Sequence, residues 1–498
     1  MIYLTVVGLI MKFLAEDNET GCISRHDVQT MAQVFIQHEG YQIVKTIPDE
    51  GLVLRVFPEN ENITAVLYEN GIPIFKSTCC DAFAAKRAVY NVLAEHTGYT
   101  PDWGLLTGIR PTKIVHQLLN SGKSPQEASD ILKELYLVSK SKSELCVDVA
   151  CNQRKILSKT PETAKNSAEA VSVYVAIPFC PSRCYYCSFA SYPIEKFGKY
   201  ASQYVEALII ELTAVSKMCN ERNMYVESIY IGGGTPTALN TRELSILLEA
   251  ISRLFDISAT KEFTVEAGRP DTINFENLKL MKHYGVNRIS VNPQTLNDTT
   301  LAKIGRNHNS DDFYRAWNAA ISVGFKNINA DLILGLTGET PDDISNTLTS
   351  LLKLSPASVT IHTLAVKRAS KLKENAESIA QDNLLEKARE MQNMINITIY
   401  HLTAAGQMPY YLYRQKNSLG NFENVGWCLP EYHGLYNIQI MEERQSIFAV
   451  GVGAVTKIIN PKKNLIKRAF NFRDLAGYLL CVDEMILRKQ QLLEEMAK

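Results

Sequence analysis

The sequence has no long hydrophobic run. Its opening stretch, MIYLTVVGLIMKFLAED (1–17), is apolar for ten residues, which is too short to span a bilayer. The stretch also lacks the basic leader and the small-residue cleavage site of a secretory signal. We therefore expect no membrane span, predict a buried first strand here, and expect the protein in the reducing cytoplasm.

An excess of charge of one sign is also missing. Lys and Arg number 52 against 53 Asp and Glu, which leaves a net charge of −1. This balance gives no electrostatic reason to expect a nucleic acid or an anionic membrane as partner. Internal repeats, a heptad seam and low-complexity tracts are absent as well. At 498 residues the chain exceeds the usual size of one hydrophobic core, so more than one domain is expected.

Periodicity and composition divide the chain into three predicted domains, 1–165, 166–380 and 381–498. The first is expected to be α+β: segments 51–58 and 63–80 alternate like strands, and Asn70-Gly71 marks a hairpin turn. Residues 82–96 and then 102–157 have helical periodicity throughout. A polar stretch, SKTPETAKNSAEA (158–170), is typical of a linker. No function is assigned to this first domain.

Six short apolar runs follow the linker, separated by segments with helical periodicity. One such helix, TRELSILLEAISRLF (241–255), has Asn240 as its expected N-cap and Glu243 three residues on. Serial strand–helix units predict an α/β fold with a parallel sheet, either an open twisted sheet or a barrel. In such folds the chemistry lies at the carboxyl ends of the strands. The apolar runs are VYVAIPF (173–179), SIYIGGG (228–234), EFTVEA (262–267), NRISVN (287–292), NINADLILGL (327–336) and SVTIHTL (358–364).

Three cysteines directly follow the first of these runs. Cys180, Cys184 and Cys187 have the spacing C-x3-C-x2-C, with aromatic residues between and after them. A structural zinc site normally takes four protein ligands, and the nearest histidine downstream, His283, is far along the chain. An iron–sulfur cluster normally takes four thiolates, so three would leave one iron open to a small molecule with an amine and a carboxylate. Three buried structural cysteines remain the alternative, which explains neither the spacing nor the aromatics.

The cysteine spacing resembles that of the radical S-adenosylmethionine (radical SAM) superfamily, in which three cysteines hold a 4Fe-4S cluster whose fourth iron binds SAM. Further motifs resemble the oxygen-independent coproporphyrinogen III oxidase (coproporphyrinogen dehydrogenase) family, in its longer Gram-positive form with an extra N-terminal region. The resemblance implies a partial (β/α)6 radical SAM barrel over 166–380, an N-terminal α+β domain and a C-terminal α/β extension that covers the site. The motifs, in chain order, are YVAIPFC, GGGTPT, TVEAGRP, RISVNPQT, IGRNHN, NADLILGLTGET and FAVGVGAVTK.

The resemblance also assigns residues. Cys180, Cys184 and Cys187 are implied as ligands of one 4Fe-4S cluster. No side chain is implied as a catalytic acid or base, because hydrogen abstraction needs none. The glycine turn 232–234 is expected to offer backbone N–H groups to the methionine end of SAM. The implied cofactor-binding residues are Tyr174, Tyr186, Gly233, Gly234, Thr235, Glu266, Gln294, Arg306 and Asp331.

Two departures from the family pattern bear on the substrate. Ala176 stands where the family has a histidine, and Phe189 stands where the decarboxylases carry a further cysteine, as it more often does among haem-chaperone relatives. We therefore keep three functions open: the coproporphyrinogen dehydrogenase, a haem-binding chaperone of the same fold, and another radical SAM activity on a tetrapyrrole or tRNA.

For the dehydrogenase, the resemblance implies that one or two SAM molecules bind and yield a 5'-deoxyadenosyl radical. The radical removes hydrogen from a propionate of coproporphyrinogen III, and loss of carbon dioxide and one electron leaves a vinyl group, twice over, to give protoporphyrinogen IX. A reduced donor such as flavodoxin or ferredoxin is the implied electron source. The tetrapyrrole has four carboxylates and needs cations, although each candidate is equally well a solvated surface charge. The candidates are Arg110, Lys113, Lys367, Arg368, Arg414 and Lys416.

Overall fold

The computed structural model describes residues 11–15, 23–35, 41–43, 46–158, 169–189, 191–365, 384–415, 421–460, 463 and 465–497. Of the opening stretch 1–17, for which a first strand is predicted, residues 11–15 form a strand and the rest lies outside these ranges. The linker residues 159–168 and the candidate cations Lys367, Arg368 and Lys416 also lie outside them. Among the described residues, no helix is both long and apolar enough to cross a membrane.

The chain forms two compact units. The first, here the N-terminal unit, comprises 1–151, 375–393 and 413–423, and the second, the barrel unit, comprises 152–374, 394–412 and 424–498. The division into three domains at 165 and 380 stays a prediction.

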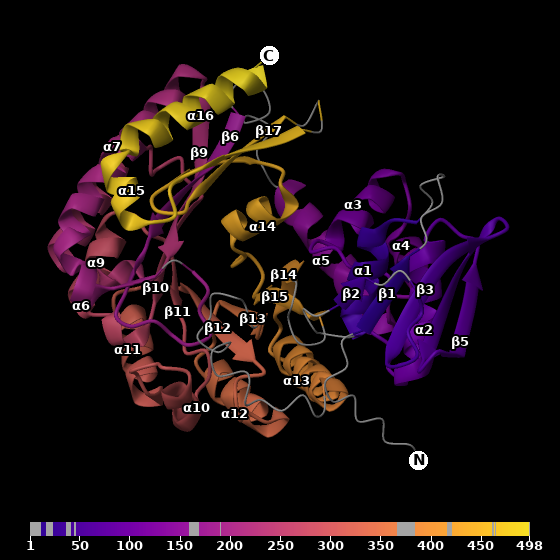
Figure 1. The fold of residues 1–498 in the computed structure, drawn as a ribbon. Helices are drawn as coiled ribbons and strands as arrows, with labels where there is room; N and C mark the ends of the chain where they lie inside the picture. The colour runs from indigo at the N-terminus through magenta and orange to yellow at the C-terminus, as the bar shows by residue number, and fades with distance from the viewer. Residues whose placement is uncertain are drawn as a thin grey trace. The chain divides into compact units, whose positions relative to one another are not determined.

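The N-terminal unit contains a mixed sheet with the strand order β2-β1-β3-β4-β5 (Figure 1). Asn70 and Gly71 both have positive φ, 51° and 77°, which is the tight hairpin turn that the sequence predicts between β4 and β5. Helices α1 and α2 share one apolar core with the inward face of β3 and β4. The elements are β1 (Met11–Ala15), α1 (Arg25–Phe35), β2 (Tyr41–Ile43), β3 (Leu52–Glu59), β4 (Asn62–Glu69), β5 (Ile72–Cys79) and α2 (Ala84–Thr97).

The prediction of continuous helix from residue 102 is wrong for residues 102–111, which form turns. Gly104 has φ 51°, and a Cβ there would lie 2.2 Å from the carbonyl oxygen of Tyr136, so the chain packs backbone to backbone. Pro111 then precedes the first helix of this stretch. The helices are α3 (Thr112–Asn120), α4 (Pro125–Tyr136) and α5 (Lys140–Ser158).

A buried ion pair lies inside the N-terminal unit. Lys142 Nζ is 2.5 Å from Glu423 Oε1, and Trp103 Nε1 donates to Glu423 Oε2 at 2.8 Å. The Arg414 guanidinium lies over the Trp103 ring at 5.2 Å, and its Nε donates to the Asn421 carbonyl at 3.0 Å. Arg414 is therefore a buried structural residue, and its candidacy as a cation for the substrate is wrong.

The barrel unit is built on parallel strands that neighbour one another in sequence order, from β6 to β13. A doubly wound sheet reverses its strand order at a switch point. This sheet does not, so it curls in one direction into a partial barrel (Figure 1). The six predicted strands are all present, as β6 (Glu169–Ile177), β9 (Met224–Gly233), β10 (Glu262–Gly268), β11 (Arg288–Val291), β12 (Asn327–Leu334) and β13 (Ser358–Thr363).

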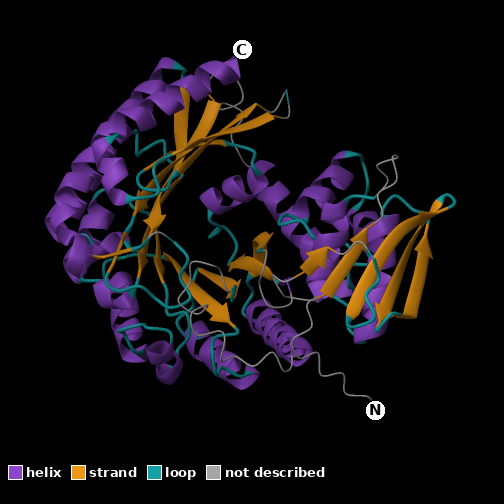
Figure 2. Ribbon diagram, in the orientation of Figure 1, coloured by secondary structure: helices purple, strands orange, loops and turns teal. Residues whose placement is uncertain are grey.

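Helices cover the outer face of this sheet (Figure 2). The capping box predicted for α8 is confirmed, because Glu243 N donates to Asn240 Oδ1 at 2.9 Å and Asn240 N donates back to Glu243 Oε2 at 3.2 Å. Two short strands, β7 (Phe179–Cys180) and β8 (Tyr192–Pro193), pair beside the end of β6. The helices are α6 (Ile194–Phe197), α7 (Ala201–Glu221), α8 (Thr241–Leu254), α9 (Phe275–His283), α10 (Asp298–Lys303), α11 (Ser310–Ser322) and α12 (Pro341–Leu352).

The C-terminal part of the chain extends the sheet at both ends. β16 pairs in parallel with the free side of β6, and β15 pairs antiparallel with β13. The motif FAVGVGAVTK (448–457) falls on two strands, β16 and β17, because the intervening turn holds Gly451 and Gly453 with positive φ. These elements are α13 (Leu384–Ala404), β14 (Met408–Arg414), β15 (Glu423–Cys428), β16 (Ser446–Val450), β17 (Val455–Asn460), β18 (Leu465–Phe470), α15 (Leu475–Leu480) and α16 (Val482–Ala497).

One further helix, α14 (Leu435–Glu442), lies on the inner face of the barrel sheet (Figure 1). The backbone N–H of Leu435 donates to the carboxylate of Glu262 on β10. The ring of Tyr436 stacks on that of Tyr230 from β9, with the centroids 4.5 Å apart. This helix therefore identifies which side chains of the strands point inward.

Candidate functional site

Polar side chains line the inner face of the barrel. They bond across neighbouring strands: Ser172 to Ser228 at 2.7 Å, and Asn329 to Ser358 at 2.9 Å. Closed barrels of parallel strands usually fill this space with branched aliphatic side chains. The polar interior therefore differs from an aliphatic barrel core and suits contact with a polar ligand. The inward-facing residues include Ser172, Tyr174, Ser228, Tyr230, Glu262, Thr264, Glu266, Arg288, Ser290, Asn329, Asp331, Ser358, Thr360 and His362.

The predicted cluster cysteines share one loop at the carboxyl end of β6. Cys180 and Cys184 are 9% and 8% exposed. Burial raises the pKa of the Cys180 thiol to about 11 and also raises that of Cys187, so neither is a stable free thiolate at neutral pH. Metal coordination removes the thiol proton and relieves this cost.

The donor set fits a cluster better than a single ion. Within the described residues, no three His, Cys, Asp or Glu side chains are grouped so that they could hold one metal ion. In a 4Fe-4S cluster each thiolate binds a different iron, so the sulfurs lie further apart than the ligands of one zinc ion do. Three spaced thiols on one loop therefore suit the cluster.

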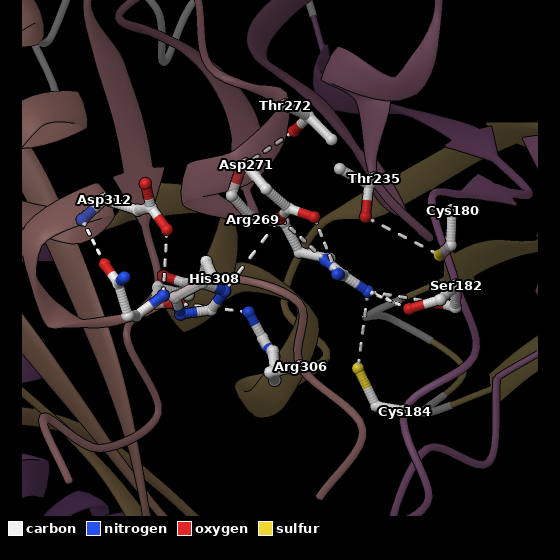
Figure 3. Close-up of polar contacts among 12 residues, drawn as sticks. Cys180, Ser182, Cys184, Thr235, Arg269, Asp271, Thr272, Arg306, His308 and Asp312 are labelled. Carbon is white, nitrogen blue, oxygen red and sulfur yellow. Dashed lines mark hydrogen bonds and ion pairs between the residues drawn. The ribbon is translucent and has the colours of Figure 1, made fainter. Parts of the chain in front are cut away.

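The glycine turn packs directly against the cysteine loop. A Cβ on Gly234 would lie 2.6 Å from the Phe179 carbonyl oxygen and 3.0 Å from Cys180 Sγ, so only glycine fits there. The Thr235 hydroxyl donates to Cys180 Sγ at 3.6 Å (Figure 3). The structure thus brings together two motifs that are well separated in the sequence.

The expectation that the N–H groups of the turn 232–234 bind SAM is wrong for Gly233 and Gly234, and the N–H of the next residue, Thr235, is occupied as well. Each of these groups already donates within the protein, so it is not free to meet a carboxylate. The acceptors, in chain order, are Glu266 Oε2 at 3.2 Å, the Ile177 carbonyl at 2.7 Å and the Phe179 carbonyl at 2.8 Å.

Glu266 lies deeper, among three stacked tyrosines. Its Oε1 accepts from the Tyr230 hydroxyl at 2.5 Å. Burial raises the pKa of Glu266 to about 7, aided by the nearby charge of Asp331 and opposed by the hydrogen bond from Tyr230. The ring of Tyr174 stacks against those of Tyr230 and Tyr436, with centroid distances of 6.1 and 5.9 Å, and its hydroxyl lies close to Gly233. Glu266 can therefore exist in both protonation states near neutral pH.

Gln294, which follows β11, pairs with β12 beside Asp331. The Gln294 N–H donates to the Asp331 carbonyl at 3.0 Å, and Gln294 has φ 68°, a strained conformation for a residue other than glycine. Asn329 donates to Asp331 Oδ1 at 2.7 Å, and His362 Nε2 lies 3.8 Å from Oδ2. Although burial favours the neutral form, these partners hold the pKa of Asp331 below its ordinary value.

Arg306 forms a hydrogen-bonded pair with Tyr186, which lies within the cysteine loop. Arg306 Nη2 donates to the Tyr186 hydroxyl at 2.9 Å, and Nη1 donates to the Asn292 carbonyl at 3.2 Å. The buried Nε of Arg306 has no hydrogen-bond partner among the described residues. Arg306 therefore retains one donor for a bound group.

Sequence reasoning missed Arg269, which is 3% exposed and touches the cysteine loop (Figure 3). Its place directly after the third predicted strand, in TVEAGRP, was an available signal, because strand ends carry the site in this architecture. Tyr230 was also missed, although it is two residues before Gly232 on the same strand face. Tyr436 reaches the barrel from the distant α14, and no local pattern marks it.

This fold and this loop define a radical SAM protein, and residues 174–351 match the family model described as the Radical SAM superfamily. The chain is 39% identical to the oxygen-independent coproporphyrinogen-III oxidase-like protein HemZ of Bacillus subtilis over 413 residues, 82% of this chain and 81% of that protein. The chain therefore belongs to the family of oxygen-independent coproporphyrinogen-III oxidase-like proteins, as its motifs predict.

Two further comparisons bear on fold and function. The solved structure of coproporphyrinogen III oxidase (HemN) from Escherichia coli, a radical SAM enzyme, matches with a TM-score of 0.52 and 22% identity over 64% of this chain and 70% of that one. This match confirms the predicted fold class. The haem chaperone HemW of Lactococcus lactis is 29% identical over 65% of this chain and 79% of its own length. The family relatives thus include both an oxidase-like protein and a chaperone.

Proposed function

We propose that the chain is a radical SAM enzyme that oxidatively decarboxylates two propionates of coproporphyrinogen III to vinyl groups, yielding protoporphyrinogen IX. The observation that carries this proposal is the meeting of the cysteine loop, the glycine turn and Glu266 at the carboxyl edge of a polar barrel. The oxidase-like name of the HemZ relative supports the choice of substrate.

In this proposal Cys180, Cys184 and Cys187 hold one 4Fe-4S cluster. The glycine turn would hold the amino-acid end of SAM through backbone carbonyl oxygens, since the N–H groups at 233–235 already donate within the protein. When bound, the reduced cluster and SAM supply the radical that removes a hydrogen atom from the substrate. The residues proposed to contact SAM are Tyr174, Tyr186, Gly233, Gly234, Thr235, Glu266, Gln294, Arg306 and Asp331.

The side chains around Glu266 position its carboxyl group and exclude water. Tyr230 and the Gly233 N–H each hold one carboxyl oxygen, so the group cannot rotate freely. The stacked rings of Tyr174 and Tyr436 lie near this carboxyl group and shield it from water. A fixed, dry carboxyl group suits the hydroxyls or ammonium of SAM, because such hydrogen bonds are strongest away from water.

We place the enzyme in the cytoplasm, with a reduced flavodoxin or ferredoxin as electron donor. Arg110 and Lys113 of the N-terminal unit stay candidates for the propionates of the substrate.

A haem chaperone of the same fold is the second candidate. Phe189, in the position that the decarboxylases give to a cysteine, is 65% exposed, and several relatives are named haem chaperones. An exposed aromatic side chain beside the cysteine loop could pack against a porphyrin face.

Anaerobic reconstitution with iron and sulfide tests the proposal. The protein is then given reductant, SAM and coproporphyrinogen III, and 5'-deoxyadenosine and porphyrins are quantified by mass spectrometry. Substrate-dependent deoxyadenosine together with loss of two carboxyl groups is the expected result. Tight haem binding without any SAM cleavage would favour the chaperone, and deoxyadenosine without decarboxylation would mean another substrate. A Cys184→Ser protein carried through the same steps is the control.

A further inference from the structure

We propose that Arg269 is a positioning residue for the cysteine loop and shifts the midpoint potential of the cluster toward easier reduction. The inference rests on the proposed cluster site. It concerns a residue that neither the cluster motif nor the SAM contacts include.

Arg269 holds the loop by three contacts from one nitrogen. Its Nη1 donates to Ser182 Oγ at 2.8 Å and to the Ser182 carbonyl at 3.2 Å, and it lies 3.9 Å from Cys184 Sγ (Figure 3). Ser182 lies between the first two cysteines, and Cys184 is the second proposed ligand. Arg269 therefore fixes the segment of the loop that joins two cluster ligands.

The other side of the guanidinium is held by a carboxylate. Nε donates to Asp271 Oδ1 at 3.0 Å and Nη2 donates to Oδ2 at 2.8 Å, a two-pronged arrangement that fixes the plane of the group. The Asp271 side chain is also mostly buried. The Asp271 carboxylate thus orients the Arg269 guanidinium toward the cysteine loop and offsets part of the positive charge of the arginine.

Arg269 is one of several cations near the cluster thiols, since Arg306 also interacts with Cys184 and Arg183 with Cys187. His308 lies 3.9 Å from Asp271, and neither of its ring nitrogens has a hydrogen-bond partner among the described residues. Burial and the neighbouring cations Arg306 and Arg269 lower the pKa of His308 to about 4, so it stays neutral. Arg306 donates to Tyr186 and to a backbone carbonyl.

A cation at this position favours the reduced cluster. Reduction adds one electron, and so one negative charge, to the cluster and its thiolates. A guanidinium beside Cys184 stabilises that added charge, and the low polarity of a buried site strengthens the effect. Asp271 acts in the opposite sense. The two residues therefore predict shifts of opposite sign.

The test is a redox titration of the reconstituted protein followed by electron paramagnetic resonance. Arg269→Gln is expected to move the midpoint potential to a more negative value, and Asp271→Asn to a more positive one. Arg269→Lys keeps the charge and is expected to stay nearer to the parent protein. An unchanged potential in Arg269→Gln with full iron content would overturn the inference. Failure of the parent protein itself to take up iron would instead overturn the proposed cluster site.

A second measurement needs no cluster. Hydrogen exchange of the loop amides at 182–187 in the iron-free protein is expected to become about tenfold faster in Arg269→Gln, because hydrogen bonds from a charged group are lost. Arg288→Gln, which removes a buried arginine that bonds to Ser358 and not to the loop, is the matched control. Equal exchange in the parent protein and in Arg269→Gln would contradict the positioning role.

Discussion

The hydroxyl of Tyr230 on β9 donates to Oε1 of Glu266 on β10 at 2.5 Å, inside the barrel. The resemblance to the family implies Glu266 as a cofactor-binding residue, but it does not imply Tyr230. The bond also holds a buried carboxyl group whose pKa is about 7. Without the Tyr230 hydroxyl, the carboxyl group of Glu266 loses one of its two donors among the described residues and keeps the Gly233 N–H. We expect Tyr230→Phe to bind SAM at least about tenfold more weakly by calorimetry, since one charge-assisted bond is removed. Tyr225→Phe, on the same strand outside this network, should bind as the parent protein does.

Glu266 gives the stability of the iron-free protein a pH dependence. Its pKa rises from an ordinary 4.5 to about 7 on folding. Between these values the folded protein binds more protons than the unfolded chain, so the free energy of unfolding falls as pH rises from 4.5 to 7. Glu266→Gln is expected to flatten this fall in urea titrations at several pH values.

Burial also raises the pKa of Glu339 to about 7, so part of the slope should remain in Glu266→Gln and become smaller still in the double variant with Glu339→Gln. The exposed Glu249→Gln serves as control. A slope equal to that of the parent protein in Glu266→Gln would contradict the assignment.

The cysteine loop should account for all bound iron. Cys184→Ser is expected to lose most of the iron and the absorbance of the reconstituted protein, because a hydroxyl is a poor substitute for a thiolate. Cys80→Ser changes an exposed cysteine of the N-terminal unit and should keep both. Equal iron in the two variants would contradict the assignment of the loop.

Gly234 should tolerate no side chain. In Gly234→Ala the Cβ would meet two carbonyl oxygens within 3.0 Å and Cys180 Sγ at 3.0 Å, so the glycine turn and the cysteine loop must separate. We expect a clear loss of reconstituted iron and of SAM binding. Gly108→Ala, whose Cβ would meet nothing within 4 Å, should leave both unchanged, and a Gly234→Ala protein with full iron would refute the close packing.

The buried pair of Lys489 and Glu211 should dominate the stability of the barrel's C-terminal edge. Lys489 Nζ lies 2.6 Å from Glu211 Oε1 with both side chains fully buried. Lys489→Met leaves the carboxylate without its counter-charge and is expected to cost about 3–5 kcal/mol of unfolding free energy in urea titrations. Lys467→Met removes an exposed pair with Glu495 and should cost less than about 1 kcal/mol. Similar costs for the two variants would contradict this ranking.

Local patterns predicted the six strands of the barrel and their parallel sheet, because alternation and capping depend on neighbouring residues, whereas the partial barrel was implied by the resemblance to the family. The box of Asn240 and Glu243 is one example, and the turn at Asn70-Gly71 is another. The cysteine loop and the glycine turn were also placed correctly at the ends of β6 and β9. These features need no knowledge of distant contacts.

Contacts between distant segments were not predictable in the same way. The N–H groups of Gly233 and Gly234 were expected to face a ligand, but Glu266 and the Ile177 carbonyl accept their hydrogen bonds. Arg414 was a candidate cation for the substrate, but its side chain is buried against Trp103. Tyr436 stacks on Tyr230 only because α14 enters the barrel from the C-terminal part of the chain. Each of these depends on tertiary structure that no short stretch encodes.

The pairing of β6 with both β9 and β16 has a consequence for synthesis on the ribosome. β6 is made well before its second neighbour, β16, which lies far along the chain. Until then one side of β6 presents unpaired backbone groups, and an open strand edge invites association with other chains. A chain that stops before β16 would keep this open edge and is therefore expected to aggregate or be degraded.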